Sequence, residues 1–274
     1  MTARNIETGT TDLLARVEHG VAVLTMNRPE RRNALSQPML QAMGTVLAQC
    51  ESDSEVGAVV LTGAGGGFCA GGDVKGMAEN NSGGPRPDLD SRIHAQRLSQ
   101  RATAGRLHMM PKPTLASLPG PAAGAGLALA LACDLRIASE NTVLTTAFAR
   151  VGFSGDYGGT YFLTQLVGTG KARELYFLSE RVGMPEALRL GLVNWVVPAD
   201  ELEKKTMEIA RRLASGPRVA YRYMKENLNR AAAGETEECL DLEATHHIHT
   251  GLTEDHREAA QAFVEKREPA FKGS

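Results

Sequence analysis

Two glycine-rich loops, each placed directly after an apolar run, constrain the fold of this chain more than any other feature. The first is Gly63–Lys75 (GAGGGFCAGGDVK), which follows the β-branched run Ala58–Thr62. The second is Gly120–Ala128 (GPAAGAGLA), which follows Pro113–Leu118 and leads into a helix expected over Gly126–Cys133. A glycine-rich turn from a strand into a helix exposes backbone N–H groups beside the positive end of the helix dipole. Such donors can bind an anion, or an oxygen that becomes negative during a reaction.

The remaining pattern predicts an α/β core. Strands are expected at Leu13–Glu18, Val21–Met26, Ala58–Thr62, Pro113–Leu118 and Leu135–Ala138, with helices at Ser36–Cys50, Ile93–Met110 and Gly126–Cys133. Ser36 is the expected N-cap of its helix. A short helix beginning within Val74–Met77 and a loop at Asn80–Asp90 are also expected. Alternating strands and helices indicate a mainly parallel sheet with crossover helices.

The last part of the chain has a different pattern. Trp195–Val197 is expected to be a strand, and helices are expected at Glu201–Ser215, Pro217–Arg230, Glu235–Thr250 and Thr253–Lys266. We therefore divide the chain into an α/β core, residues 1–198, and a C-terminal helical region, residues 199–274.

Composition and charge exclude several classes of protein. The 274 residues carry 30 Lys and Arg against 32 Asp and Glu, and this formal charge of −2 argues against binding to nucleic acid or to a membrane surface. The uncharged stretch Pro113–Cys133 is interrupted by Pro119-Gly120-Pro121, which favours a strand, a turn and a buried helix over a membrane span. The first 20 residues lack a signal-like apolar run, and the four cysteines lack C-x-x-C spacing. We expect reduced thiols in a cytoplasmic protein.

The glycine loops allow three interpretations. The series Gly65-x-Gly67-x-x-Ala70 fits a dinucleotide fingerprint, but Gly71-Gly72 delays the required helix, and no acidic residue ends a strand about 20 residues later. No G-K-[ST] sequence occurs, which excludes a Walker loop. In the second interpretation, one N–H group from each loop converges on a carbonyl oxygen and forms an oxyanion hole. In the third, the glycines only permit tight packing.

Two other patterns carry less chemistry. His246, His247 and His249 share one expected helix, but their spacing does not place all three on one face, so no metal site is predicted. Ser154 is not a nucleophile elbow, because Asp156 occupies the position of the second glycine in G-x-S-x-G.

Several specific motifs occur in order between residues 12 and 272. They are Asn27–Glu30, Arg32–Leu35, Val59–Gly63, Phe68–Lys75, Ala132–Asp134, Gly191–Val193 and Phe263–Arg267. Together they resemble the crotonase (enoyl-CoA hydratase/isomerase) superfamily. The resemblance implies the ClpP/crotonase-like fold of stacked β-β-α turns and a C-terminal helical region that forms a trimer or a dimer of trimers. It also implies an acyl-CoA thioester substrate and no separate cofactor, because coenzyme A is part of the substrate.

The resemblance also assigns roles to residues. The thioester oxygen would accept hydrogen bonds from the backbone N–H groups of Gly72 and Ala125, where Ala125 replaces the family's usual glycine. Phe263 and Lys266 match positions that reach the coenzyme from a neighbouring subunit, and Arg31 matches a position near its phosphorylated end. The implied substrate-binding positions are Arg31, Arg32, Ala34, Ala70, Asp73, Val74, Lys75, Phe148, Tyr157, Phe263 and Lys266.

The sequence departs from the family's hydratases at both of their catalytic glutamates. Ala128 and Phe148 stand at those positions, and the nearby acid is Asp156. The position of Asp156 resembles the catalytic aspartate of 1,2-epoxyphenylacetyl-CoA isomerases of the phenylacetate pathway, dienoyl-CoA isomerases and 4-chlorobenzoyl-CoA dehalogenases. The histidine and tryptophan of the dehalogenases have Gly105 and Phe148 in their places, which argues against that branch. The motifs that favour the first branch are Ala147–Gly152, Gly158–Thr160 and Arg267–Gly273.

A single carboxylate suits an isomerase, because it can remove a proton from one carbon and return it two carbons away. Burial of Asp156 among aromatic side chains would raise its pKa and help it in both steps; the expected neighbours are Phe148, Phe153, Tyr157 and Tyr161. The alternative is that Asp156 is only a turn residue.

We therefore expect an acyl-CoA isomerase that moves a double bond or rearranges an epoxide beside a thioester. Its expected catalytic groups are Asp156 and the backbone of Gly72 and Ala125. One alternative is an enoyl-CoA hydratase of fatty-acid or aromatic-acid degradation in which Asp156 acts with a water. Another is a non-catalytic relative that binds acyl-CoA or RNA.

Overall fold

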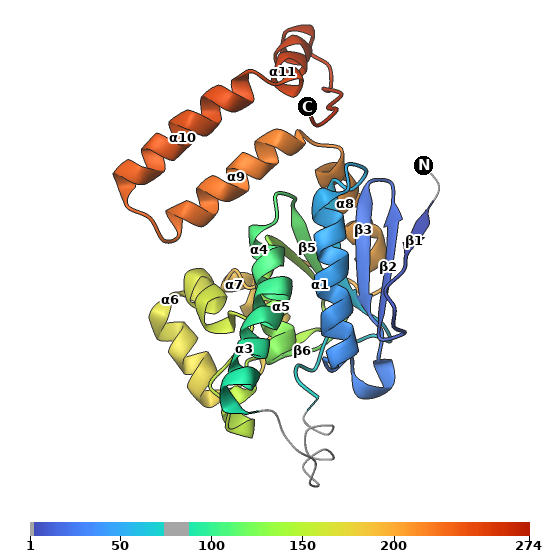
Figure 1. Cartoon of the computed structure of the whole chain (residues 1–274), viewed down its shortest axis with the longest axis vertical. Helices are drawn as coiled ribbons and strands as arrows, with labels where there is room; N and C mark the ends of the chain where they lie inside the picture. Colours follow the sequence, from blue (N-terminus) through green and yellow to red (C-terminus); the bar gives the residue numbers. More distant parts are fainter. Residues whose placement is uncertain (1–2, 74–87) are drawn as a thin grey trace.

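One sheet of seven strands lies at the centre of residues 3–73 and 88–274, which the computed structural model describes (Figure 1). In sheet order the strands are β1 (Arg4–Ile6), β2 (Leu13–Glu18), β3 (Val21–Met26), β4 (Ala58–Gly63), β5 (Thr114–Leu118), β7 (Leu135–Ser139) and β10 (Trp195–Val197). Neighbours from β1 to β3 are antiparallel, and neighbours from β3 to β10 are parallel. The strands expected from the sequence and their mainly parallel arrangement are confirmed.

The helix α1 (Gln37–Ser52) confirms the helix predicted after Ser36. The Ser36 side chain accepts a hydrogen bond of 3.2 Å from the Met39 backbone N–H, and Pro38 occupies the first turn. The face with Met39, Met43 and Leu47 is buried in the main core. This apolar stripe at helical spacing is what holds the helix on the sheet.

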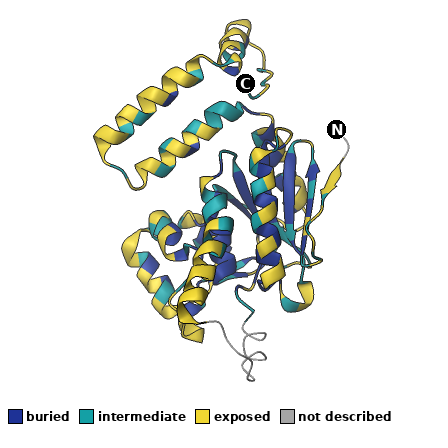
Figure 2. Cartoon of the chain, viewed as in Figure 1, coloured by how far each residue is buried: buried dark blue, intermediate teal, exposed yellow. Residues whose placement is uncertain are grey.

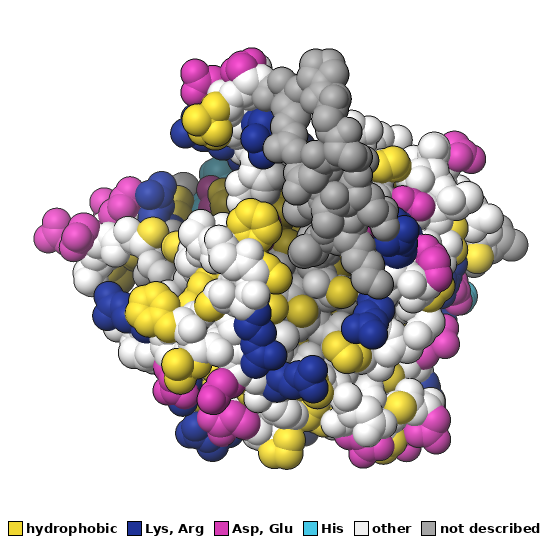
Figure 3. Space-filling model, turned by 90° about the horizontal axis from the view of Figure 1, so that it is seen from below, with side chains coloured by type: hydrophobic (Ala, Val, Ile, Leu, Met, Phe, Trp, Pro, Cys, Tyr) yellow, Lys and Arg dark blue, Asp and Glu magenta, His cyan; other side chains and the backbone are white. Residues whose placement is uncertain are grey.

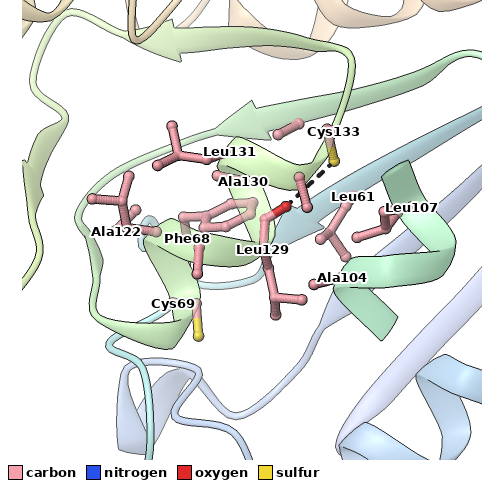
Figure 4. Close-up of a cluster of buried hydrophobic side chains, with 14 of the residues drawn as sticks. Leu61, Phe68, Cys69, Ala104, Leu107, Ala122, Leu129, Ala130, Leu131 and Cys133 are labelled. Carbon is pink, nitrogen blue, oxygen red and sulfur yellow. Dashed lines mark hydrogen bonds between the residues drawn. The ribbon is translucent and has the colours of Figure 1, made fainter. Parts of the chain in front are cut away.

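The helix α5 (Ala125–Ala132) lies inside the molecule, and all eight of its residues are buried. Its sequence AGLALALA contains no polar side chain, as a helix buried on every side requires. Figure 4 shows Leu129, Ala130 and Leu131 of α5 among Phe68, Leu61 and other apolar side chains. The uncharged stretch before Cys133 is therefore a strand, a turn and a buried helix, as expected. No helix in the described part of the chain has the length and apolar character to cross a membrane.

A small second sheet lies beside α5. Its strands are β6 (Ala122–Ala123), β8 (Val143–Thr145) and β9 (Val182–Gly183), in that order. A bridge between Cys69 and Ala122 joins this sheet to the first glycine loop. Strands of two or three residues give no periodic signal, and they were not expected from the sequence.

The segment after the undescribed residues is helical from an earlier point than expected. The helix α3 (Leu89–Gln100) begins at Leu89 because the Asp88 side chain accepts a hydrogen bond of 3.0 Å from the Ser91 N–H. Placing Leu89 and Asp90 in a loop was therefore wrong. A π-helical turn (Arg101–Gly105) and α4 (Arg106–Met109) continue the expected helix. The other residues expected as helix (74–77) and loop (80–87) lie outside the described residues.

Between β8 and β10 the structure contains two helices and a single turn that had not been assigned. They are the 3₁₀ turn η3 (Phe148–Val151), α6 (Gly159–Leu178) and α7 (Met184–Arg189). The backbone of Gly168 is non-helical inside α6, so the helix is kinked there. A second 3₁₀ turn, η1 (Pro29–Arg31), precedes α1.

The four C-terminal helices are confirmed as α8 (Leu202–Ala214), α9 (Arg218–Ala231), α10 (Thr236–Gly251) and α11 (Glu254–Glu265). Leu202, Ala210 and Ala214 of α8 form a second core cluster with the central sheet. By contrast, α9, α10 and α11 project away from the sheets, and most of their residues are exposed (Figures 1 and 2). The division of the chain at residue 198 remains a prediction. Although α8 follows this boundary in the sequence, it packs against the sheet of the α/β core.

Candidate active site

The two glycine loops converge beside the N-terminus of α5. The Ala123 N–H donates a hydrogen bond of 2.9 Å to the Cys69 carbonyl. A Cβ added at Gly126 would lie 2.4 Å from that carbonyl oxygen, and one at Gly71 would lie 3.3 Å from the Ala125 nitrogen. Glycine is therefore required at Gly126 and Gly71, because a side chain at either position would push the loops apart.

This convergence places two backbone donors next to each other. Ala125 is the first residue of α5, where N–H groups have no partner within a helix. Its N-cap, Gly124, has φ 52° and ψ −125°, a conformation that only glycine adopts readily, and provides no side-chain cap. Within the described residues, neither the Gly72 nor the Ala125 N–H donates a hydrogen bond. Both donors predicted for the oxyanion hole are thus brought together, and their role remains a prediction.

Asp156 lies in the segment between η3 and α6, and one of its carboxylate oxygens is buried. Its Oδ1 atom has no hydrogen-bond partner among the described residues. Burial raises the pKa of Asp156 from 3.8 to about 6, because removal from water disfavours the charged form. The neighbouring Tyr157 is fixed by hydrogen bonds of 2.6 Å from its N–H to Gln100 and 3.1 Å between its hydroxyl and Ser99. A turn residue would keep its carboxylate in water, so this burial favours a chemical role.

Asp156 is connected to the oxyanion donors through Gly159 and α5. The Gly159 N–H donates a hydrogen bond of 3.0 Å to the Asp156 carbonyl. A Cβ on Gly159 would lie 3.1 Å from the Cβ of Ala128, which is one turn after Ala125 on α5. The segment that carries the carboxylate therefore packs against α5, the helix that begins at the predicted oxyanion donor Ala125.

The aromatic surroundings of Asp156 differ from the expectation. Phe148 and Tyr157 are buried, but Phe153 is 57% exposed and Tyr161 is 40% exposed, so these two do not enclose the carboxylate. Tyr161 makes an edge contact with His108 of α4 instead. Sequence reasoning missed Tyr176 on α6, whose ring stacks on Phe148 with centroids 5.8 Å apart. A tyrosine 20 residues beyond Asp156 inside a helix carries no local signal that could have found it.

Hydrogen bonds from a neighbouring arginine hold the end of the first glycine loop. Arg28 donates hydrogen bonds to the Ala34 carbonyl at 2.8 Å and to Asp73 at 3.1 Å. Asp73 is thus held by Arg28, while Ala70 and Arg32 are exposed; the substrate-binding role of these residues remains a prediction. Arg31 ends η1 and Arg32 follows it with a left-handed backbone, φ 53°. Val74 and Lys75 fall outside the described residues.

The single chain does not bring every expected residue to this site. Phe263 and Lys266 belong to α11 and the residue after it, which lie with the C-terminal helices, far from β6 and the start of α5 (Figure 1). Phe263 is 86% exposed. Their contact with coenzyme from a neighbouring subunit remains a prediction.

Of the three histidines of α10, His246 packs inside the C-terminal helices. It is buried, its Nδ1 lies 2.5 Å from the Asn227 Oδ1, and its ring makes a tilted contact with that of Tyr223. No group of three His, Cys, Asp or Glu side chains that could hold a metal occurs in residues 3–73 and 88–274.

Figure 3 shows the molecule from below the view of Figure 1. Hydrophobic side chains and Lys and Arg side chains adjoin one another near the middle of this view, and Asp and Glu side chains lie mainly toward its margin.

Comparisons with known proteins agree with this geometry. The family model described as enoyl-CoA hydratase/isomerase matches residues 16–274. The short-chain-enoyl-CoA hydratase of Clostridium acetobutylicum is 38% identical over 251 residues, covering 91% of this chain and 93% of the relative. The 1,2-epoxyphenylacetyl-CoA isomerase of Escherichia coli is 35% identical over 261 residues, covering 95% and 98%. The crystal structure of an enoyl-CoA hydratase from Bacillus anthracis matches with a TM-score of 0.88 and 33% identity, covering 96% of this chain and all of that chain. This chain therefore belongs to the enoyl-CoA hydratase/isomerase family and has its crotonase fold.

Proposed function

We propose that this acyl-CoA enzyme is an isomerase in which Asp156 moves a proton while the Gly72 and Ala125 N–H groups stabilise a thioester enolate. The observation that carries the proposal is the partly buried Asp156 carboxylate, whose buried Oδ1 has no partner among the described residues, on a segment packed against α5. The isomerase-named relative at 35% identity supports it.

The reaction needs only these groups. With the thioester oxygen between the two donors, Asp156 removes a proton from C2 of a 3-enoyl thioester, and the negative charge moves onto the oxygen. Each preorganised donor stabilises that charge by roughly 3–4 kcal/mol. Asp156 then returns the proton to C4, which leaves the 2-enoyl isomer and restores the carboxylate. A pKa of about 6 suits both steps, because the group accepts and releases a proton near neutral pH.

The same site lacks the side chains of a two-glutamate hydration mechanism. Ala128 and Phe148 stand where the hydratases of the family are expected to have glutamates, and both are buried apolar residues here. Neither can orient a water or deliver a proton. Hydration is nevertheless the second candidate, because the relative at 38% identity is named a hydratase. In that case Asp156 would activate the water alone.

We also propose how the rest of the substrate is held. Arg31 and Arg32 are the candidates for the phosphates of the coenzyme, and no separate cofactor takes part. A trimer or dimer of trimers built on α9, α10 and α11 would bring Phe263 and Lys266 to a neighbouring subunit. The exposed apolar side chains of these helices support assembly; they include Leu228, Leu240, Ile248 and Val264.

The test offers the purified protein cis-3-enoyl-CoA and, separately, trans-2-enoyl-CoA. We expect conversion of the 3-enoyl to the 2-enoyl thioester, abolished in Asp156→Asn and retained in Asp200→Asn. Asp200 is an exposed aspartate without a side-chain hydrogen bond in the described residues, so it is a matched control. Hydration of the 2-enoyl thioester at a comparable rate would make hydratase the better assignment. Inactivity on both would contradict the proton shuttle and direct the assay to epoxide or aromatic thioesters.

A further inference from the structure

The stacked pair Phe148 and Tyr176 is held rigidly next to the candidate active site. Their ring planes are only 11° apart. The Thr146 hydroxyl donates a hydrogen bond of 2.7 Å to the Leu175 carbonyl and lies 3.3 Å from the Ser179 hydroxyl, which fixes the C-terminal end of α6 beside β8. Phe148 is buried at the start of η3. The pair therefore has little freedom to move aside.

The Phe148 ring lies beside the N-terminus of α5, and the Tyr176 ring lies beside the segment that carries Asp156. A Cβ added at Gly124, the residue before the oxyanion donor Ala125, would lie 3.7 Å from the Phe148 ring. The Tyr176 hydroxyl lies 2.7 Å from the position of a Cβ on Gly159 and 3.4 Å from that on Gly155. These two glycines flank Asp156 in the sequence. The pair thus spans the distance between the oxyanion helix and the segment of the carboxylate.

One pocket next to the pair has no room for a water molecule. Phe148 and Tyr176 line a pocket together with Gly124, Ala128 and Gly159, and the free space in it has no volume that a water molecule could occupy. A water needs about 10–15 Å³ and two or more polar partners. Ala128 and Phe148 are also the two positions at which a hydratase of this family is expected to hold its water. Here aromatic carbon occupies that region.

We propose that Phe148 and Tyr176 are specificity-determining residues that favour isomerisation over hydration by filling the space from which a water would reach the acyl chain beside Asp156. This inference rests on the proposed function. Hydration of a 2-enoyl thioester would form a bond from the water oxygen to C3 and pass one water proton to Asp156, which would then deliver that proton to C2. With the water excluded, the 2-enoyl thioester formed by isomerisation leaves the site without being hydrated.

The test opens the pocket from either side. Tyr176→Ala and Phe148→Leu each remove part of the pair, and the ratio of 2-enoyl hydration to 3-enoyl isomerisation is measured in each. We expect the ratio to rise at least about tenfold, the order of discrimination that a few methylene groups provide in a pocket. Phe177→Ala removes a neighbouring ring that is 75% exposed and should keep the ratio of the unmodified protein. A ratio unchanged in both opened variants would overturn the proposal.

A second measurement does not depend on turnover. The carboxyl infrared band of Asp156, isolated by subtraction of Asp156→Asn, is titrated in the folded protein. Entry of water should lower its pKa from about 6 toward 3.8 in the opened variants, whereas Phe177→Ala should leave it unchanged. No lowering in either opened variant would refute water exclusion. A lowering in protein that lacks isomerase activity would refute the proposed function and leave water exclusion supported.

Discussion

Replacement of Asp156 by asparagine should abolish isomerisation and, at the same time, stabilise the folded protein. The free carboxylate is disfavoured by its surroundings, since burial raises its pKa from 3.8 to about 6 and its Oδ1 has no partner among the described residues. That pKa difference corresponds to about 3 kcal/mol, at about 1.4 kcal/mol for each tenfold change in an ionisation constant. The group is only partly buried, and solvent screening reduces the cost to about 1–2 kcal/mol.

The sign and the pH range of this stability difference follow from the different pKa of Asp156 in the folded and the unfolded chain. Below pH 3.8 the carboxyl group is protonated in the folded and the unfolded chain, and ionisation costs the fold nothing. As the pH rises from 3.8 to about 6, the unfolded chain ionises first, so the original protein loses stability relative to Asp156→Asn. Above a pH of about 6, the difference in the free energy of unfolding between the two proteins no longer grows. At pH 8 the variant should therefore melt about 2–8 °C higher, given about 2–4 °C per kcal/mol for a chain of this size.

The assay is thermal unfolding of both proteins by circular dichroism from pH 4 to pH 8, together with kcat/KM for 3-enoyl-CoA. Removal of the general base should lower kcat by about 10²–10⁴-fold. In the unmodified protein, kcat/KM should fall as the pH drops through about 6, because the protonated group cannot accept the C2 proton. Asp200→Asn should change neither quantity. Equal or lower stability of Asp156→Asn at pH 8 would refute the claim that the carboxylate is buried without compensation.

Three further changes test the loops and the C-terminal helices. Ala125→Pro removes one predicted oxyanion donor at the first position of α5, where proline is tolerated. We expect kcat to fall about 10²–10³-fold while the far-ultraviolet circular dichroism is unchanged, and an undiminished kcat would exclude this donor. Gly126→Ala places a Cβ against the Cys69 carbonyl and should cost about 1–3 kcal/mol in urea unfolding, along with activity, whereas Gly170→Ala, where nothing lies nearby, should not. Lys225→Met leaves Asp134 without the ammonium group 2.9 Å away and should lower the free energy of unfolding by about 2–3 kcal/mol. A smaller loss of stability than in the exposed Lys205→Met would show that this ion pair does not fasten α9 to the core.

Local signals in the sequence were sufficient for most elements and for the two glycine loops. Ser36 caps α1 because its hydroxyl lies where a helix needs an acceptor, and an all-apolar helix such as α5 can only be buried. The aromatic environment of Asp156 could not be predicted in the same way. Tyr176 reaches the site through the packing of α6, whereas Phe153 and Tyr161, which are close in sequence, turn outward.

The glycines around Asp156 explain how burial of the carboxylate and exclusion of water are connected. Gly155 and Gly159 have no side chains, so the Tyr176 hydroxyl can approach their backbone within distances that a Cβ would not allow. That approach closes the pocket next to Ala128 and contributes to the burial of Asp156. A second carboxylate at residue 128 or 148 would need water or a partner there, and two nearby carboxylates would repel each other. The apolar residues at positions 128 and 148, the aromatic pair and the raised pKa of Asp156 therefore belong to one arrangement, and it is the arrangement that the proposed isomerase requires.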